Sequence, residues 1–281
     1  MAEVIKVVGT QVYVQVFEST RGLKVGAEAE FTGHMLEVTL GPGMLSKNYD
    51  GLQNDLDKMD GVFLKRGQYT YPLDKESKWH FVPLAKAGDQ VEAAAWLGQV
   101  DENFQPLKIM VPFGQKGVCT VKSIVKEGDY GIEDTIAVLT DEEGNDVKVN
   151  MIQKWPVKRA MTNYKEKPRP FKLLETGVRV IDTVNPIVEG GTGFIPGPFG
   201  TGKTVLQHAI SKQAEADIVI IAACGERANE VVEIFTEFPE LVDPHTGRKL
   251  MERTIIIANT SNMPVAAREA SVYTAMTIAE Y

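Results

Sequence analysis

A short stretch of the chain has glycines, a lysine and a threonine at a spacing that suits phosphate chemistry. Residues 197–204 read GPFGTGKT and fit the pattern G-x-x-x-x-G-K-[ST]. Glycines let the backbone curl so that successive N–H groups point at phosphate oxygens, and a following helix aims its positive end at the same anion. We expect Lys203 to reach the β- and γ-phosphates of a nucleotide, and the hydroxyl of Thr204 to ligate Mg²⁺.

The neighbouring residues make this match more specific than a glycine-rich turn. Average amino-acid usage gives on the order of one chance match per hundred chains of this length. The apolar pair Phe194 and Ile195 predicts a short strand before the loop, and residues 204–216 have the apolar spacing of a helix after it. The sequence therefore predicts a site for magnesium ATP or ADP, formed by Gly197, Pro198, Phe199, Gly200, Thr201, Gly202, Lys203, Thr204 and Val205.

A second segment carries a carboxylate and a guanidinium. Residues 219–231 read VIIAACGERANEV, in which a predicted strand ends at Ala223 and is followed by Gly225, Glu226 and Arg227. Ligands of open parallel sheets lie at the carboxyl ends of the strands. There Glu226 is a candidate to orient and polarise the attacking water, and Arg227 to hold the γ-phosphate or to fix Glu226. The spacing fits equally well an acidic residue that only stabilises the start of a helix.

The elements that must position these two segments alternate between helix and strand. Residues 175–186 and 204–216 have helical spacing, whereas residues 217–224 and 253–260 are continuous β-branched runs. Such runs are typical of strands that are buried on both faces of a parallel sheet. The chain after Phe171 is therefore predicted to be an α/β domain with a parallel sheet.

The earlier part of the chain is predicted to be β-rich. Residues 3–18 alternate around a turn at Gly9, residues 22–33 resemble short barrel strands, and residues 40–51 are dense in turn residues. Residues 136–151 predict a hairpin, and the basic, proline-rich segment 155–172 predicts a linker. We expect three domains: 1–75 with connecting loops, an inserted β-rich module at 76–153, and the nucleotide-binding domain at 154–281.

Composition excludes several classes of protein. The net charge of −8 argues against a nucleic-acid-binding protein, and the longest apolar runs are too short to span a bilayer. The two cysteines have no CxxC spacing and the four histidines are scattered, so we expect neither a disulfide scaffold nor a zinc site. Cysteine usage favours the cytosol.

Several segments together resemble a known family. IPGPFGTGKT, GERANEV, LGPGMLSKNYDGLQNDLDKM and the long stretch EFPELVDPHTGRKLMERTIIIANTSNMPVAAREASVYTAMTIAEY are similar to the catalytic A subunits of prokaryotic A-type and V-type rotary ATPases and ATP synthases. The resemblance runs over nearly the whole chain and is most specific from Gly197 to Tyr281. It implies a partial N-terminal β-barrel, an inserted bulge domain and a truncated RecA-like P-loop domain.

The resemblance also implies roles and partners. Lys203 and Thr204 become phosphate and magnesium contacts, Glu226 becomes the catalytic carboxylate and Arg227 a phosphate-side arginine. The implied assembly is an alternating hexamer with the family's B subunits, together with central and peripheral stalk subunits, which couples ATP hydrolysis or synthesis to proton or sodium transport. The catalytic subunit would be cytoplasmic and would meet the cell membrane only through the complex.

Three departures from the family pattern matter. Thr201 stands where vacuolar relatives carry a cysteine, so disulfide control of the loop is not expected, and GLQNDLDKM replaces the more usual GIQRPL. Both ends of the chain fall inside the family's sequence, so we expect a fragment that lacks the family's magnesium-shell aspartate and adenine pocket. Such a fragment is expected to be inactive when isolated.

The sequence also allows other functions. A soluble P-loop ATPase or kinase that is not coupled to ion transport would share the loop, but would need an acceptor pocket or a lid. A non-catalytic subunit of the same ring would have no use for Glu226. Arg268 and Glu269 lie in a segment that the family places near a subunit interface, and their types equally fit a surface ion pair.

Overall fold

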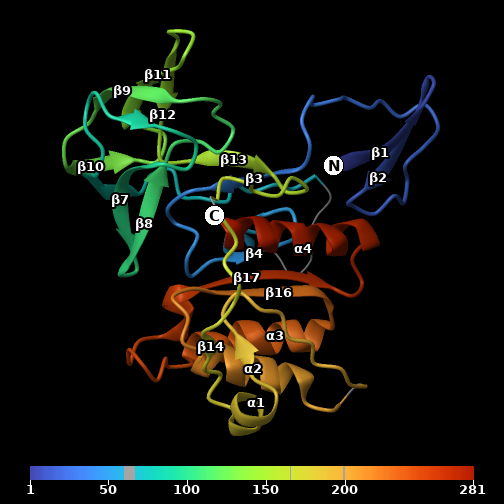
Figure 1. The fold of residues 1–281 in the computed structure, drawn as a ribbon. Coiled ribbons are helices and arrows are strands. Elements are labelled where there is room, and N and C mark those ends of the chain that lie inside the picture. The colour runs from blue at the N-terminus through green and yellow to red at the C-terminus, as the bar shows by residue number, and fades with distance from the viewer. Residues whose placement is uncertain (60–66, 165, 199) are drawn as a thin grey trace.

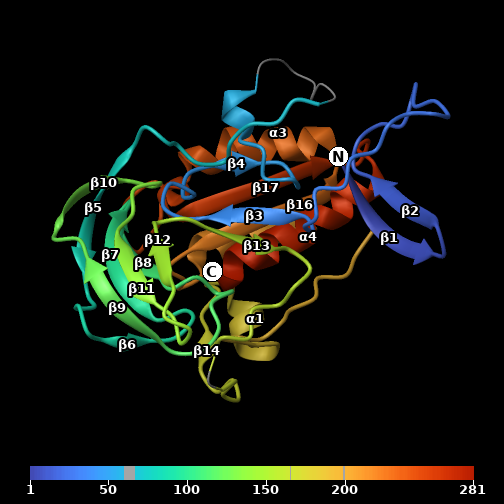
Figure 2. The same cartoon turned by 90° about the horizontal axis from the view of Figure 1, so that it is seen from above.

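The computed structural model describes residues 1–59, 67–164, 166–198 and 200–281. A layered α/β region forms one end of the molecule, and the β-rich part of the chain lies against its other side (Figure 1). Within that part, a lobe made of two four-stranded sheets and the N-terminal hairpin lie on opposite sides of the molecule (Figure 2). The predicted combination of an α/β part with β-rich parts is confirmed.

The α/β region is built on a three-stranded parallel sheet in the order β16–β17–β4. Helix α4 covers one face of this sheet, and helices α3 and α2 lie on the other (Figure 1). The prediction of a parallel α/β sheet is therefore confirmed. The elements are β4 (Asn48–Tyr49), β16 (Val219–Glu226), β17 (Thr254–Thr260), α2 (Lys203–Gln213), α3 (Ala228–Glu237) and α4 (Val265–Glu280).

The strands of this sheet differ in burial. β17 is central and almost wholly buried, as the sequence predicts. β16 forms an edge among the described strands and leaves Ala222 and Cys224 exposed, so the expectation that it is buried on both faces is wrong. The other edge strand, β4, comes from a segment predicted to be a loop. Asn48 and Tyr49 form a strand there because they pair with Ile256 and Ile257 of β17, which are distant in the sequence.

The lobe formed by residues 78–149 contains two four-stranded antiparallel sheets, in the orders β10–β5–β7–β8 and β12–β11–β9–β6. Buried Leu97 and Val121 belong to the same hydrophobic cluster and come from different sheets, so the sheets pack face to face. The predicted hairpin is confirmed as β11 and β12. The strands are β5 (Lys78–Pro83), β6 (Gln90–Val91), β7 (Trp96–Glu102), β8 (Gln105–Met110), β9 (Cys119–Ile124), β10 (Gly128–Gly131), β11 (Ala137–Thr140) and β12 (Asp146–Val149).

The N-terminal part contributes a two-stranded hairpin, β1 (Ala2–Val8) with β2 (Gln11–Val16). The described residues do not form a closed barrel, and the strands expected in residues 22–33 are absent from that stretch. Gly22, Gly26 and Gly33 all have positive φ, which interrupts the extended backbone that a strand needs.

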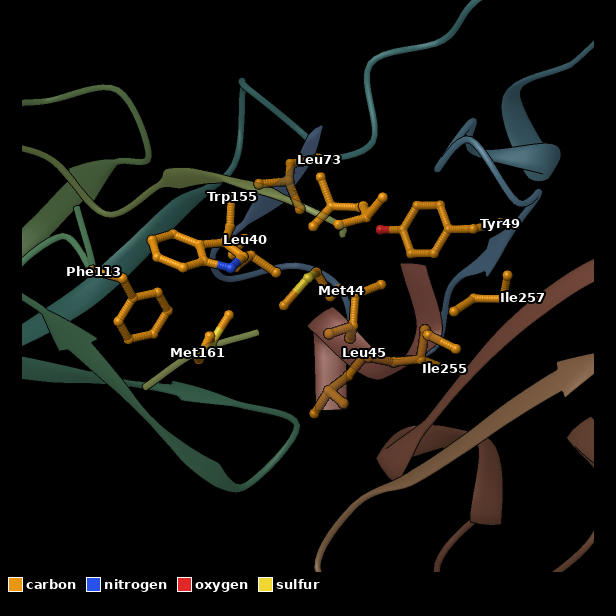
Figure 3. Close-up of a cluster of buried hydrophobic side chains, with 14 of the residues drawn as sticks. Leu40, Met44, Leu45, Tyr49, Leu73, Phe113, Trp155, Met161, Ile255 and Ile257 are labelled. Atoms are coloured by element: carbon orange, nitrogen blue, oxygen red, sulfur yellow. The ribbon is translucent and has the colours of Figure 1, made fainter. Parts of the chain in front are cut away.

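The central hydrophobic core joins the lobe to the α/β sheet. In Figure 3, Tyr49, Ile255 and Ile257 lie on the sheet side, and Phe113 and Trp155 on the lobe side. Trp155 was predicted to lie in the linker. That expectation is wrong, because strand β13 (Gln153–Pro156) pairs with β3 (Glu37–Leu40) and carries the indole into the core, where its ring packs edge-on to Phe113 at a centroid distance of 5.5 Å.

A hairpin tip provides a second connection between the lobe and the α/β sheet. The buried carboxylate of Glu102, at the end of β7, accepts a hydrogen bond of 2.6 Å from the backbone N–H of Leu45. The backbone N–H groups of Gly43 and Met44 also bond to it. The next residue, Asn103, donates to the carbonyl of Glu252 at 3.0 Å, just before β17 begins. These contacts attach the lobe to the amino-terminal ends of β4 and β17.

A small connecting unit leads into the phosphate-binding loop. It consists of β14 (Leu173–Leu174), helix α1 (Arg179–Val184) and β15 (Ile187–Val188), and the two strands pair with each other. The helix predicted in residues 175–186 is confirmed by α1. The carboxylate of Asp182 accepts bonds from both the N–H and the hydroxyl of Thr176, at 3.0 and 2.7 Å, and ties this helix to the segment before it. The described part of the chain also contains three short 3-10 helices: Leu56–Lys58, Phe238–Glu240 and Leu250–Arg253.

Candidate phosphate-binding site

Two glycines let the loop turn into helix α2. Gly200 and Gly202 have φ values of +79° and +82°, in the left-handed region that residues with a Cβ rarely adopt. Gly202 directly precedes α2, and its carbonyl accepts the first intrahelical bond from the N–H of Leu206, at 2.9 Å. The N–H groups of the three residues between them have no partner within the helix. They are therefore available to an anion at the loop.

Lys203 folds across this loop. Its ammonium donates to the carbonyls of Gly197 and Pro198 at 2.7 and 2.9 Å. The hydroxyl of Thr201 donates to the same Pro198 carbonyl at 2.7 Å. The positive charge of Lys203 is thus held at the loop, where an arriving phosphate group would exchange these neutral carbonyl contacts for charged oxygens.

The short strand predicted before the loop is not formed. Residues 191–198 are irregular, and Phe194 is 86% exposed. A strand needs a neighbouring strand for its ladder hydrogen bonds. Here a cavity of about 520 Å³ separates residues 193–196 from β16, and α2 forms its third wall. Thr204 and Glu226 line the same cavity, so it extends to the functional residues.

The loop and the second predicted segment meet through Glu230, a residue that the sequence motifs do not single out. The hydroxyl of Thr204 donates to the carboxylate of Glu230 at 3.2 Å, and the carboxyl groups of Glu230 and Glu226 are hydrogen-bonded to each other. The structure therefore brings Lys203, Thr204, Glu226 and Glu230 together. The available signal was the spacing, since a second acid four residues after Glu226 falls in the first turn of α3.

The two glutamates titrate as a pair. The hydrogen bond to Glu230, together with burial and the like charge, raises the pKa of Glu226 to about 7. The same hydrogen bond lowers the pKa of Glu230. The opposite charges of Lys203 and Arg227 act on both groups and favour their ionised forms. One proton is thus shared between the carboxyl groups near neutral pH, and Glu226 is the member that carries it.

Arg227 lies at the junction between β16 and α3. It is the residue before the first residue of α3, and its carbonyl accepts a bond of 3.0 Å from the N–H of Val231. The positive charge of Arg227 favours the ionised forms of Glu226 and Glu230, so it lies near the glutamate pair, and its role at a γ-phosphate stays a prediction. Phe199 falls outside the described residues. Among the described residues, Arg268 and Glu269 do not form the ion pair that their types allowed, and Nε of Arg268 is buried there without a hydrogen-bond partner.

The oxygen atoms at the site suit Mg²⁺. This cation prefers hard oxygen ligands and keeps several waters, so one hydroxyl and one carboxylate beside a phosphate are a sufficient protein contribution. The Thr204 hydroxyl and the Glu230 carboxylate are such a pair, already in contact. Within the described ranges there is no group of three or more His, Cys, Asp or Glu residues that would hold a metal by itself.

Comparison with known families matches most of the chain. Residues 177–281 match the model of the ATP synthase alpha/beta family, nucleotide-binding domain. Residues 70–158 match the barrel-sandwich domain of the ATP synthase alpha/beta subunits, and residues 1–33 match the beta-barrel domain of the same family. The loop, Glu226 and Glu230 all lie within the first of these matches.

Curated relatives align with the whole chain. The V-type ATP synthase alpha chain of Treponema denticola is 58% identical over 283 aligned positions, which cover 100% of this chain and 48% of the relative. The proteins of that name from Borrelia hermsii and Borreliella burgdorferi are 55% and 53% identical over the same share of this chain and 49% of their own length. The chain thus spans about half the length of the curated relatives it matches. None of the helices that the structure describes is both long and apolar enough to cross a membrane.

Proposed function

This chain belongs to the ATP synthase alpha/beta family, and on that premise we propose that it is the ATP-binding, catalytic part of a V-type ATP synthase alpha chain. The observation that carries the proposal is the contact between Thr204, at the start of α2, and Glu230, which is bonded to Glu226. It joins a phosphate-binding loop to one carboxyl group that can bind a metal ion and another that can position water, which are groups that hydrolysis of a phosphoanhydride uses.

Each side chain has a separate task in this proposal. The free N–H groups at the start of α2 and the ammonium of Lys203 bind the phosphates, and Arg227 adds positive charge on the side of the γ-phosphate. Thr204 and Glu230 would hold Mg²⁺, which would neutralise charge on the phosphates when it is bound. Glu226, once ionised, accepts a hydrogen bond from the attacking water and orients it in line with the leaving oxygen.

The loop must change its contacts when a nucleotide binds. The ammonium of Lys203 leaves the carbonyls of Gly197 and Pro198 for phosphate oxygens. If Thr204 and Glu230 held a cation, its positive charge would favour the ionised form of the neighbouring Glu226, as the charges of Lys203 and Arg227 already do. Binding of magnesium ATP would therefore leave Glu226 ionised, which is the form that accepts a hydrogen bond from the attacking water.

The proposed setting is a rotary complex. The parent protein would alternate with B subunits in a ring, contact central and peripheral stalk subunits, and couple ATP hydrolysis or synthesis to proton or sodium transport. Its contact with the membrane would run through the other subunits. Support for this setting comes from the relatives, which are named V-type ATP synthase alpha chains.

Affinity purification of the tagged parent protein from native membranes tests this function. We expect a ring partner and stalk subunits to co-purify, with magnesium-dependent ATP hydrolysis that is lost in Lys203→Ala. A parent protein that hydrolyses ATP or phosphorylates an acceptor without any ring partner would favour a soluble P-loop ATPase or kinase instead.

A further inference from the structure

A β-bulge interrupts the pairing of β16 with β17 immediately before Glu226. The two strands pair in parallel as far as Cys224 and Asn259, and the next pair is Glu226 with Thr260. Gly225 is the extra residue of this bulge, and its φ of +89° lies in the left-handed region. Because a bulge redirects the side chains next to it, the direction of Glu226 depends on the conformation of Gly225.

The side chain of Arg268 lies against this glycine. A Cβ atom added to Gly225 would be 2.9 Å from Cδ of Arg268 and 3.2 Å from its Nη1. Both are closer than ordinary van der Waals contact, so the arginine occupies the space that a side chain at position 225 would need. The closest atom belongs to the aliphatic stem, which makes this primarily a packing contact.

Other interactions give no reason for an arginine at this position. The N–H of Arg268 bonds to the carbonyl of Pro264 at 3.2 Å, so the residue lies in the first turn of α4, where the helix dipole disfavours a positive charge. Its Nε is buried and has no acceptor in the part of the chain that the structure describes. The contact with Gly225 is what remains to account for the position of the side chain.

The backbone on the other side of the bulge is also fixed. The carbonyl of Glu226 accepts a bond of 2.7 Å from the N–H of Ser261, in the turn that joins β17 to α4. Arg268 is at the start of the same helix. The turn and the helix therefore hold residues 225 and 226 at two points, one through the Glu226 carbonyl and one through the side chain of Arg268.

We propose that Arg268 is a positioning residue, whose aliphatic stem holds the Gly225 bulge so that Glu226 faces Glu230 and the phosphate-binding loop. Arg268 acts through Gly225 and makes no contact with the nucleotide. The geometric part of the proposal depends only on this chain, whereas the part that concerns turnover rests on the proposed function.

Hydrogen–deuterium exchange tests the geometric part. In Arg268→Ala, we expect the amides of residues 224–227 and 259–263 to exchange at least about 10-fold faster than in the wild type, and those of α2 to be unchanged. Arg268→Met, which keeps an unbranched stem of similar length, should restore slow exchange. Glu269→Ala is the matched control, because Glu269 is the exposed neighbour. Unchanged exchange in Arg268→Ala would overturn the proposal.

A double-mutant cycle in the assembled complex tests the functional part. Arg268→Ala should lower turnover at least about 10-fold with little change in nucleotide affinity, and Arg268→Met should recover most of it. In a Glu226→Gln background, Arg268→Ala should cause no further loss, because the residue it positions has lost its charge. Equal losses in both backgrounds, or weaker nucleotide binding, would contradict the proposal. A wild-type complex without ATP hydrolysis would refute the proposed function, and hydrogen exchange would then decide the role of Arg268.

Discussion

The hydroxyl of Thr204 lies 3.2 Å from the carboxylate of Glu230 and donates a hydrogen bond to it. Thr204 belongs to the first turn of the helix after the phosphate-binding loop, and Glu230 to the first turn of the helix after β16. One hydrogen bond therefore connects the two segments that the sequence singles out. Through the bond between Glu230 and Glu226 it also connects the candidate magnesium ligands to the candidate base.

The shared proton makes stability depend on pH. Because the pKa of Glu226 is raised to about 7, the folded chain holds a proton that the unfolded chain releases above its ordinary pKa. This contribution to stability is present at low pH and is lost as pH rises through about 7. The pKa of Glu230 is lowered, so its contribution to stability is present at neutral pH and is lost only as pH falls below the ordinary range of a glutamate.

In Glu230→Gln, the side-chain amide can donate a hydrogen bond to ionised Glu226. The loss of stability that the wild type shows as pH rises through about 7 should therefore disappear. We expect the variant to gain stability relative to the wild type between about pH 5 and pH 8, as measured by urea unfolding of the ligand-free chain. A constant difference between the two proteins over this range would show that the carboxyl groups do not share a proton.

Replacement of the candidate base should separate binding from turnover. Glu226→Gln keeps the size of the side chain and removes the charge that polarises water. In the assembled complex we expect nucleotide affinity to change little and turnover to fall roughly 100-fold or more. Glu233→Gln, an exposed acid on the outer part of α3, is a suitable control. Near-normal turnover in Glu226→Gln would show that Glu226 does not act as the base and serves only as a charge at the start of a helix.

The Glu102 contact should stabilise the connection between the lobe and the α/β sheet. Glu102→Ala leaves the backbone N–H groups of Gly43 and of the buried residues Met44 and Leu45 without their acceptor. We expect a loss of about 1–3 kcal/mol in the free energy of unfolding, since unsatisfied buried donors cost that much. Its exposed neighbour provides the control, Asp101→Ala, which should be nearly neutral. Equal effects of the two variants in denaturant unfolding would argue against this contact.

A buried ion pair holds the turn before β17. Nε of Arg253 lies 3.1 Å from Oδ2 of Asp243, and both side chains are almost wholly buried. Arg253→Met would leave the Asp243 carboxylate buried without its partner, at a cost of about 3–5 kcal/mol. The exposed pair of Lys249 and Glu240 is the comparison, and Lys249→Met should cost less than about 1 kcal/mol. Thermal unfolding of the two variants checks this difference, and similar melting temperatures would contradict it.

The features that the sequence predicted well depend on local patterns. The loop follows from glycine spacing and a helix that begins at Lys203, and β17 follows from a continuous β-branched run. The features it missed depend on contacts between distant residues. Asn48 and Tyr49 become a strand only because they lie beside β17, and Trp155 enters the core only through the pairing of β13 with β3.

The candidate site shows the same division. Lys203, Thr204 and Glu226 could be singled out from their residue types and spacing in the sequence. Glu230 becomes a candidate only because the first turn of α3 lies beside Thr204. The strand expected at Phe194 and Ile195 was wrong because apolar character alone does not provide a pairing partner. Sequence patterns thus singled out the candidate residues, and tertiary contacts determined which of them lie together.

Binding of magnesium ATP to this chain is the measurement that tests the central claim most directly. Calorimetric titration should detect binding by the wild type, and Lys203→Ala should weaken it roughly 10- to 100-fold, the scale expected for losing a charged contact to the phosphates. Lys212→Ala, in the last turn of the same helix, is the matched control and should bind as the wild type does. If Lys203→Ala binds magnesium ATP as tightly as the wild type and Lys212→Ala do, residues 197–204 do not hold the phosphates.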